Sequence, residues 1–156
     1  MDALVDGVIR FVVPGVPRGA QRARSTVITP RNRPSFISTY TPTETRAEQS
    51  AIRLFAATAM AGRPPLEGPL DLRISAYFSV PASWSGRKRA LALSDRLRPT
   101  GKPDHDNIDK LICDSLKGVT WLDDSQVTDA HLWKRYAREP RITVEIRQIV
   151  LAMADP

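Results

Sequence analysis

Apolar and polar residues alternate most clearly between residues 70 and 80, where the sequence reads LDLRISAYFSV. Every second side chain from Leu70 to Phe78 is apolar. Side chains of a strand point alternately to opposite faces, so this pattern predicts a strand with one buried face.

Three other stretches are candidates for strands of the main sheet. Residues 8–13 form an apolar run without alternation, which predicts a strand covered on both faces and placed inside the sheet. Residues 127–136 and 141–150 predict two further strands, joined near residues 138–140 as an antiparallel pair.

Two stretches have helical spacing. The first begins at Thr41 or Thr43, ends near Ala61 and is stopped by the glycine and prolines that follow. Its expected packing face consists of Ala47, Ala51, Leu54, Phe55 and Thr58. The second covers residues 107–117, with Asp106 or Asn107 as its cap. Its apolar stripe, which should face inward, consists of Ile108, Leu111, Ile112 and Leu116.

These elements predict an α+β fold in which a mixed sheet packs against helices. A chain of 156 residues with 42% hydrophobic content can build one core, so residues 1–156 should form a single compact domain. Residues 81–100 contain a basic cluster and predict a helical insertion, and residues 151–156 are expected to be a tail.

Charge is distributed unevenly along the chain. The formal net charge is +6, but residues 1–103 carry a net charge of +9 and residues 104–156 carry −3. The excess of positive charge favours an anionic partner, either nucleic acid or an acidic membrane surface. No apolar run is long enough to cross a bilayer, and the start of the chain lacks the pattern of a secretion signal. With a single cysteine, which excludes an internal disulfide, a cytoplasmic protein is expected.

The acidic residues gather in one part of the chain. Seven of them lie between residues 104 and 129: Asp104, Asp106, Asp109, Asp114, Asp123, Asp124 and Asp129. If the chain folds back after the second predicted helix, the pair Asp104 and Asp106 would meet the pair Asp123 and Asp124. Converging carboxylates repel one another unless a cation lies between them, and carboxylate oxygens favour Mg²⁺ or Mn²⁺ over Zn²⁺. Lys110 lies one helical turn from Asp106 and could position or activate water, or offset charge that develops on a phosphate. The alternative is that these acids only cap a helix and solvate a turn.

The spacing of these residues has a known counterpart. The patterns K-P-D-x-D-N-x-x-K, G-V and D-D-S-Q-V between residues 102 and 127 resemble the RusA family of Holliday junction resolvases. The resemblance implies that Asp104, Asp106 and Asp124 are catalytic metal ligands, that Lys110 is a catalytic lysine and that Asp123 is a supporting ligand or a neighbour of the ligands.

Basic residues predict where DNA would bind. The segment PGVPRGAQRAR, residues 14–24, resembles the G-x-x-R-x-R segment of phage-type members and precedes extended candidates at residues 25–29 and 35–40. Phosphate contact and a merely solvated loop are equally good interpretations of it. The candidate DNA-binding residues are Arg18, Arg22, Arg24, Arg87, Lys88, Arg89, Lys102 and Lys117. Trp84, Trp121 and Trp133 are expected to be buried anchors in preference to base-stacking platforms.

The resemblance implies a Mg²⁺-dependent endodeoxyribonuclease that resolves Holliday junctions by paired symmetric nicks during recombination and repair, with Mn²⁺ as a substitute metal. It also implies a homodimer and a phage or prophage origin. Two alternatives stay open from the residues: a nuclease that cuts flaps or forks, and a non-catalytic architectural protein that binds junctions.

Overall fold

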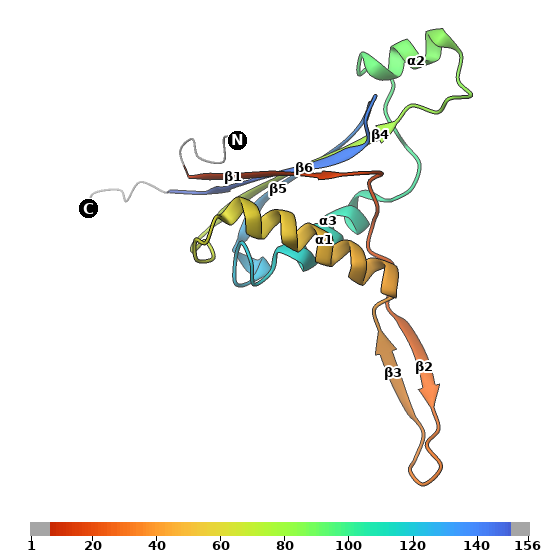
Figure 1. The fold of residues 1–156 in the computed structure, drawn as a ribbon, viewed down its shortest axis with the longest axis vertical. Helices are drawn as coiled ribbons and strands as arrows, with labels where there is room; N and C mark the ends of the chain where they lie inside the picture. The colour runs from red at the N-terminus through yellow and green to blue at the C-terminus, as the bar shows by residue number, and fades with distance from the viewer. Residues whose placement is uncertain (1–6, 151–156) are drawn as a thin grey trace.

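The computed structural model describes residues 7–150 and contains one main sheet, one small sheet and three α-helices (Figure 1). The elements in chain order are β1 (Val8–Pro14), β2 (Arg24–Ile28), β3 (Phe36–Tyr40), α1 (Thr43–Met60), β4 (Leu70–Ser79), α2 (Gly86–Leu93), α3 (His105–Leu116), the 3₁₀ turn η1 (Asp124–Gln126), β5 (Val127–Ala137) and β6 (Arg141–Gln148). The predicted α+β class with a mixed sheet is therefore confirmed.

The main sheet has the strand order β1-β6-β4-β5. β4 pairs antiparallel with β6 and parallel with β5, so β4 lies between the last two strands of the chain. The prediction that β5 and β6 pair with each other is therefore wrong. The prediction that residues 8–13 lie inside the sheet is also wrong, because β1 is an edge strand with alternating burial. Val12 is apolar although it is exposed, and it therefore hides the alternation of this half-buried strand in the sequence.

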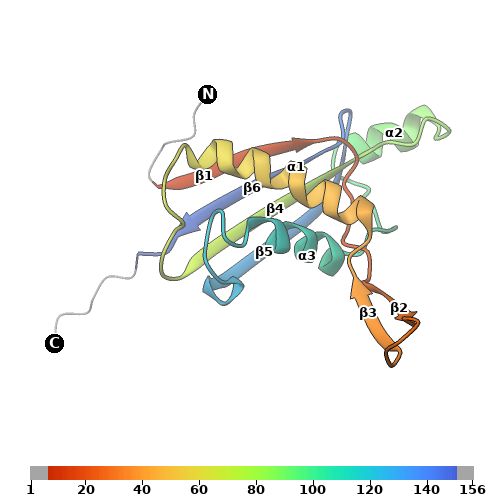
Figure 2. The same ribbon diagram turned by 60° about the horizontal axis from the view of Figure 1, so that its bottom comes forward.

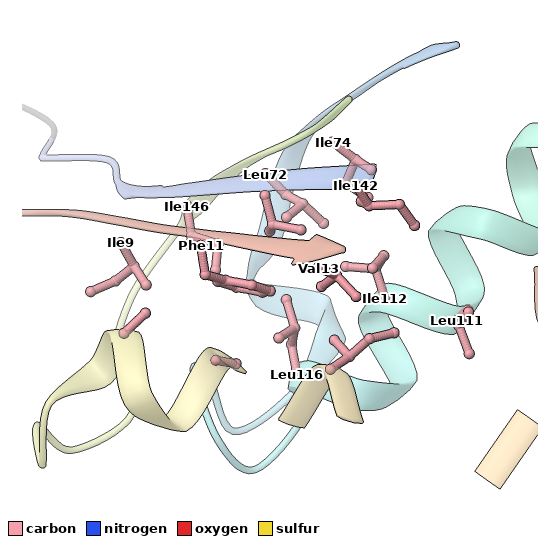
Figure 3. Close-up of a cluster of buried hydrophobic side chains, with 14 of the residues drawn as sticks. Ile9, Phe11, Val13, Leu72, Ile74, Leu111, Ile112, Leu116, Ile142 and Ile146 are labelled. Carbon is pink, nitrogen blue, oxygen red and sulfur yellow. The ribbon is translucent and has the colours of Figure 1, made fainter. Parts of the chain in front are cut away.

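Helices α1 and α3 cover one face of the main sheet, as Figures 1 and 2 show. Between them and the sheet lies the core, part of which is drawn in Figure 3. Its strand residues include Ile9, Phe11, Val13, Leu72, Ile74, Ile142 and Ile146, and its α3 residues include Leu111, Ile112 and Leu116. The alternation predicted for residues 70–80 and the apolar stripe predicted for α3 are both confirmed. Burial of these aliphatic side chains is the main stabilising term of such a domain.

Of the packing face expected for α1, only Phe55 packs against the core, and the helix buries a different set of residues. Its buried residues are Thr45, Ile52, Ala56, Ala59 and Met60, while Leu54 is 67% exposed. The alanines of this helix fit more than one apolar stripe, and the sheet selects the stripe that contains Ile52 and Met60.

Helix α3 begins two residues earlier than predicted. Its N-cap is Asp104 and its first residue is His105, so Asp106 lies in the first turn and neither Asp106 nor Asn107 is the cap. The helix ends at Leu116, with Lys117 as its C-cap.

The region of the predicted insertion contains only the short helix α2, which begins after Ser85, whose hydroxyl accepts a hydrogen bond from Lys88 N–H. Of the three tryptophans, Trp121 is fully buried, as expected. Trp84 is half-buried and packs edge-on against Tyr136. Trp133 is 36% exposed on the sheet face away from the helices and stacks on His131, so its expected burial is wrong.

The extended candidates at residues 25–29 and 35–40 form the hairpin β2–β3, a separate two-stranded sheet that stands away from the main body (Figures 1 and 2). The expected tail at residues 151–156 lies outside the described residues. None of the helices between residues 7 and 150 has both the length and the apolar character needed to span a membrane.

Candidate active site

The loop that leads into α3 places Asp104 at the surface. The backbone carbonyl of Asp104 accepts the Ile108 N–H at 3.2 Å, but its carboxylate makes no capping hydrogen bond. Lys134, on the neighbouring strand β5, donates to the carbonyls of Gly101 and Pro103 and so ties this loop to the sheet. The loop is therefore fixed while the Asp104 carboxylate stays available.

A glycine brings the basic loop against the start of α3. Ala20 N–H donates to the Asn107 carbonyl at 2.8 Å. A Cβ on Gly19 would lie 2.8 Å from the Asn107 Cβ and 3.0 Å from the Pro103 Cβ, too close for any larger residue without a shift. Gly19 is thus required by close approach, and it places Arg18 beside the acidic segment.

The two acids at the start of α3 line different cavities. Asp104 lines a cavity of about 450 Å³ together with Arg18 and Lys102. Asp106 lines one of about 290 Å³ together with Asp109 and residues 130–132 of β5. This division accompanies the helix start at His105, because Asp106 lies in the first helical turn whereas Asp104 precedes the helix with an extended backbone.

The second acidic pair lies in and beside the turn η1. Trp121 is completely buried, and its indole N–H donates to a carboxylate oxygen of Asp124 at 2.8 Å. A buried indole needs a hydrogen-bond acceptor, so Asp124 satisfies it and is itself held in one orientation.

Asp123 has a different set of partners. Its carboxylate accepts the Ser125 N–H at 3.0 Å and pairs with the Lys117 ammonium at 3.1 Å. The hydrogen bonds from Ser125 and the nearby Lys117 lower the pKa of Asp123 to about 2. The Gln126 side chain completes the turn by accepting the N–H of Asp123 and donating to the Leu66 carbonyl.

The outer side of α3 carries further charge. Lys110 pairs with Asp114 at 3.2 Å, one turn further along the helix. Burial, with a smaller contribution from Asp124, raises the pKa of Asp109. Burial, Asp109 and Asp124 raise the pKa of the Cys113 thiol to about 12.

The acids do not form a closed metal cage in a single chain. Within residues 7–150, no three Asp, Glu, His or Cys side chains are grouped closely enough to hold an ion. Mg²⁺ nevertheless often binds through one or two carboxylates, retained waters and substrate phosphates. Asp106 and Asp109 share a cavity, so the carboxylates present there suit a hard cation.

The candidate DNA-binding residues fall into separate groups. Arg18 and Lys102 line the Asp104 cavity, and Arg18 also pairs with Glu48 at 3.3 Å. Arg22 and Arg24 lie exposed at the base of the β2–β3 hairpin.

The remaining basic candidates lie elsewhere. Lys117 is paired with Asp123 beside η1. Arg87, Lys88 and Arg89 are exposed on α2, at the opposite end of the molecule from the hairpin (Figure 1). The Lys88 ammonium lies 3.9 Å from the centre of the Trp84 ring, a cation–π contact.

Comparison with known proteins decides the family. The family model described as "Endodeoxyribonuclease RusA" matches residues 14–147. The chain belongs to the RusA family. It is also 32% identical over 145 residues to "Uncharacterized protein YqaN" of Bacillus subtilis (strain 168), an alignment that covers 90% of this chain and 96% of the relative. The resemblance to RusA predicted from the sequence is therefore confirmed, and the chain is a member of an endodeoxyribonuclease family.

The region that matches the family model also contains residues that support the candidate site without belonging to the acidic motif. The match includes three supporting residues that sequence reasoning did not single out: Gly19, Gln126 and Lys134. Gly19 lies in the basic segment of residues 14–24 and Gln126 in the D-D-S-Q-V pattern, so both belong to family-like motifs. Their roles were missed because they contact residues distant in sequence. Lys134 has no sequence signal, because its role depends on the pairing of β5 beside the α3 loop.

Proposed function

We propose that this RusA family member is a Mg²⁺-dependent endodeoxyribonuclease that resolves four-way DNA junctions by paired symmetric nicks. The family match carries the proposal, because it extends over residues 14–147 and includes every candidate acid and Lys110. A net charge of +6 supports an anionic substrate.

Each candidate residue receives a role in phosphodiester hydrolysis. Asp104, Asp106 and Asp124 would hold the ion, and Asp104, which lines a separate cavity from Asp106, would have to turn towards the other two to do so. The bound ion would lower the pKa of a water molecule and neutralise phosphate charge. Lys110 would offset the charge that develops on the phosphate oxygens. Its ion pair with Asp114 is exposed and therefore weak, so a phosphate can replace Asp114 as its partner. Water attacks phosphorus and forms a new P–O bond while the bond to the 3′ oxygen breaks; the 3′ oxygen takes up a proton, which leaves 5′-phosphate and 3′-hydroxyl ends.

Asp123 receives a supporting role. Its carboxylate is already occupied by the Ser125 N–H and the Lys117 ammonium, and these contacts hold the turn that presents Asp124. A direct contact between Asp123 and the ion would have to replace one of them.

Symmetry supports a homodimer. A four-way junction has pairs of equivalent strands, and two copies related by a two-fold axis would bring two equivalent sites to them. We further propose that Mn²⁺ can replace Mg²⁺, since both favour carboxylate oxygens, and that the protein acts in the cytoplasm in recombination and repair.

The experiment is cleavage of a labelled synthetic four-way junction in Mg²⁺, Mn²⁺ or EDTA, beside linear duplex and a flap. The test variant is Asp106→Asn, and the control is Glu139→Gln, an exposed acid in the turn between β5 and β6. Asp106→Asn should reduce cutting by about a thousandfold, the size found when one group that stabilises transition-state charge is removed. Junction binding should persist, because the basic surface is unchanged.

The outcomes separate the three functions. Paired nicks that require metal and Asp106 support resolution of junctions. Preferential cutting of the flap would keep the chemistry and replace the substrate, whereas tight junction binding without cutting in either metal would favour an architectural protein. Undiminished cutting by Asp106→Asn would reject the assignment of the site.

A further inference from the structure

The β2–β3 hairpin, residues 24–40, is here called the arm. Its two strands pair only with each other among the described strands, and it extends away from the main sheet (Figures 1 and 2). All of its residues except Pro30 and Ser38 are exposed. It therefore receives no core from the rest of the described chain.

Both faces of the arm carry apolar side chains near its tip. Ile28 pairs with Phe36 on one face, and Val27 pairs with Ile37 on the other. Ile37 is 71% exposed, Val27 65% and Phe36 52%. An isolated two-stranded hairpin is at best marginally stable in water, and grouped exposed apolar residues mark an interaction surface. The arm is thus built to meet another molecule.

The charge of the arm favours an anionic partner. No acidic residue occurs between residues 7 and 43. Arg22 and Arg24 lie at the base of the arm, and Arg31 and Arg33 lie in the loop at its tip. None of these four arginines takes part in a salt bridge within residues 7–150. A surface that is apolar and purely cationic matches nucleic acid, which combines phosphate charge with apolar base faces.

The base of the arm is fixed at the candidate active site. Gln21 precedes β2 and donates to the Glu44 carboxylate at 2.8 Å, while its backbone N–H donates to the Thr45 hydroxyl at 3.2 Å. Glu44 and Thr45 follow β3, so these bonds join the two ends of the arm. All three residues line the cavity that contains Asp104. DNA bound at Asp104 would consequently lie beside the arm.

We propose that the arm recognises the branch point of DNA. A two-stranded ribbon is narrow enough to enter the major groove. In that position Arg31 and Arg33 can reach phosphates, and Phe36, near the tip, is close to the bases. In linear duplex the base faces are stacked on one another and only their edges are accessible. Where strands exchange between helices, base faces are exposed, and an aromatic ring can stack on them. The arm would therefore favour branched DNA over linear duplex. This inference rests on the proposed function, whose active-site residues alone do not choose among substrates.

The test measures binding in EDTA, so that no strand is cut, to a four-way junction and to linear duplex of equal length. The variants are Phe36→Ala and the double variant Arg31→Gln with Arg33→Gln. Matched controls are Leu54→Ala, an exposed apolar residue of α1, and Arg96→Gln with Arg138→Gln, two exposed arginines outside the arm. A 2-aminopurine base at the branch point reports stacking by its fluorescence.

Phe36→Ala should lower the preference for junction over duplex about tenfold, consistent with the loss of one base stack. It should also abolish the change in 2-aminopurine fluorescence that the wild type produces. The arginine double variant leaves both strands intact and should lower junction affinity with a shallower salt dependence. The controls should keep the wild-type values.

Three results would overturn the proposal in distinguishable ways. Unchanged preference and fluorescence in Phe36→Ala, with a wild type that cuts junctions, would reject the arm and keep the proposed function. Conversion of a wild-type dimer to a monomer by the arm variants, measured by light scattering, would assign the arm to a second copy of the chain. A wild type that neither prefers nor cuts junctions would remove the proposed function itself, and the arm proposal with it.

Discussion

The two acidic pairs differ in what holds their side chains. Within residues 7–150, the carboxylates of Asp104 and Asp106 make no hydrogen bond or ion pair with another side chain or with a backbone N–H. Asp124 is fixed by the indole of Trp121, and Asp123 by Ser125 and Lys117. One pair is thus held in place before any ligand binds, while the other is free to adjust to a cation and a phosphate.

This difference teaches that neighbouring acids in one motif need not have one role. Asp124 has an oxygen free of the Trp121 hydrogen bond, so it can be preoriented and still accept a ligand. Asp123 uses its carboxylate to cap η1 and to neutralise Lys117. In the pair Asp123 and Asp124, the second acid is therefore a candidate metal ligand and the first stabilises the turn that holds it.

The largest expected effect separates these two adjacent acids. Asp124→Asn should lower junction cutting by about a thousandfold, because it removes a charge that acts in the transition state. Asp123→Asn should lower it by less than about tenfold, since Asn can still accept the Ser125 N–H and cap the turn. Single-turnover cutting at saturating Mg²⁺ measures both. Equal losses in the two variants would show that the acids act as a ligand pair.

A smaller effect is expected from the residue that orients Asp124. Trp121→Phe removes the indole donor at 2.8 Å but keeps an aromatic ring in the core. Cutting should fall about tenfold at low Mg²⁺ and recover partly at high Mg²⁺, because loss of an orienting group typically costs tenfold to a hundredfold in metal affinity or activity. The measurement is the Mg²⁺ concentration that gives half-maximal rate.

The control for this substitution is Trp84→Phe, which changes a half-buried tryptophan that packs on Tyr136 and makes no hydrogen bond to an acid within residues 7–150. It should leave the Mg²⁺ requirement unchanged. Thermal unfolding of both variants accounts for any loss that comes from packing alone. An unaltered Mg²⁺ requirement in Trp121→Phe would mean that the hydrogen bond serves only to satisfy the buried indole.

Local periodicity predicted the elements whose burial follows one regular pattern. The strand β4 and the apolar stripe of α3 were found because the main sheet and its covering helices impose periods of two and 3.6 residues on them. The edge position of β1 and the insertion of β4 between β5 and β6 depend on contacts between distant segments. Val12 and Leu54 are apolar but exposed, so the apolar pattern alone assigned them wrongly to the core.

The candidate site was predictable in composition more than in geometry. Spacing located the acids and Lys110, but a shift of two residues at the start of α3 places Asp104 and Asp106 in different cavities. The hydrogen bond from Trp121 to Asp124 and the close approach of Gly19 to Asn107 arise only when the chain folds. The sequence contains all of these residues but does not show which of them contact one another.

The smallest expected effect is the dependence of stability on pH at Asp123. Folding lowers the pKa of this carboxyl from 3.8 to about 2, chiefly through the Ser125 hydrogen bonds and Lys117. The charged form is therefore favoured in the folded state, so its stabilisation is complete above about pH 4 and is lost as the pH falls towards 2. Asp123→Asn should unfold at a lower temperature than the wild type at pH 6, and the two unfolding temperatures should converge near pH 2. Glu139→Gln provides the matched removal of a surface acid, and a difference between wild type and Asp123→Asn that widens in acid would contradict the assigned role of Lys117 and Ser125.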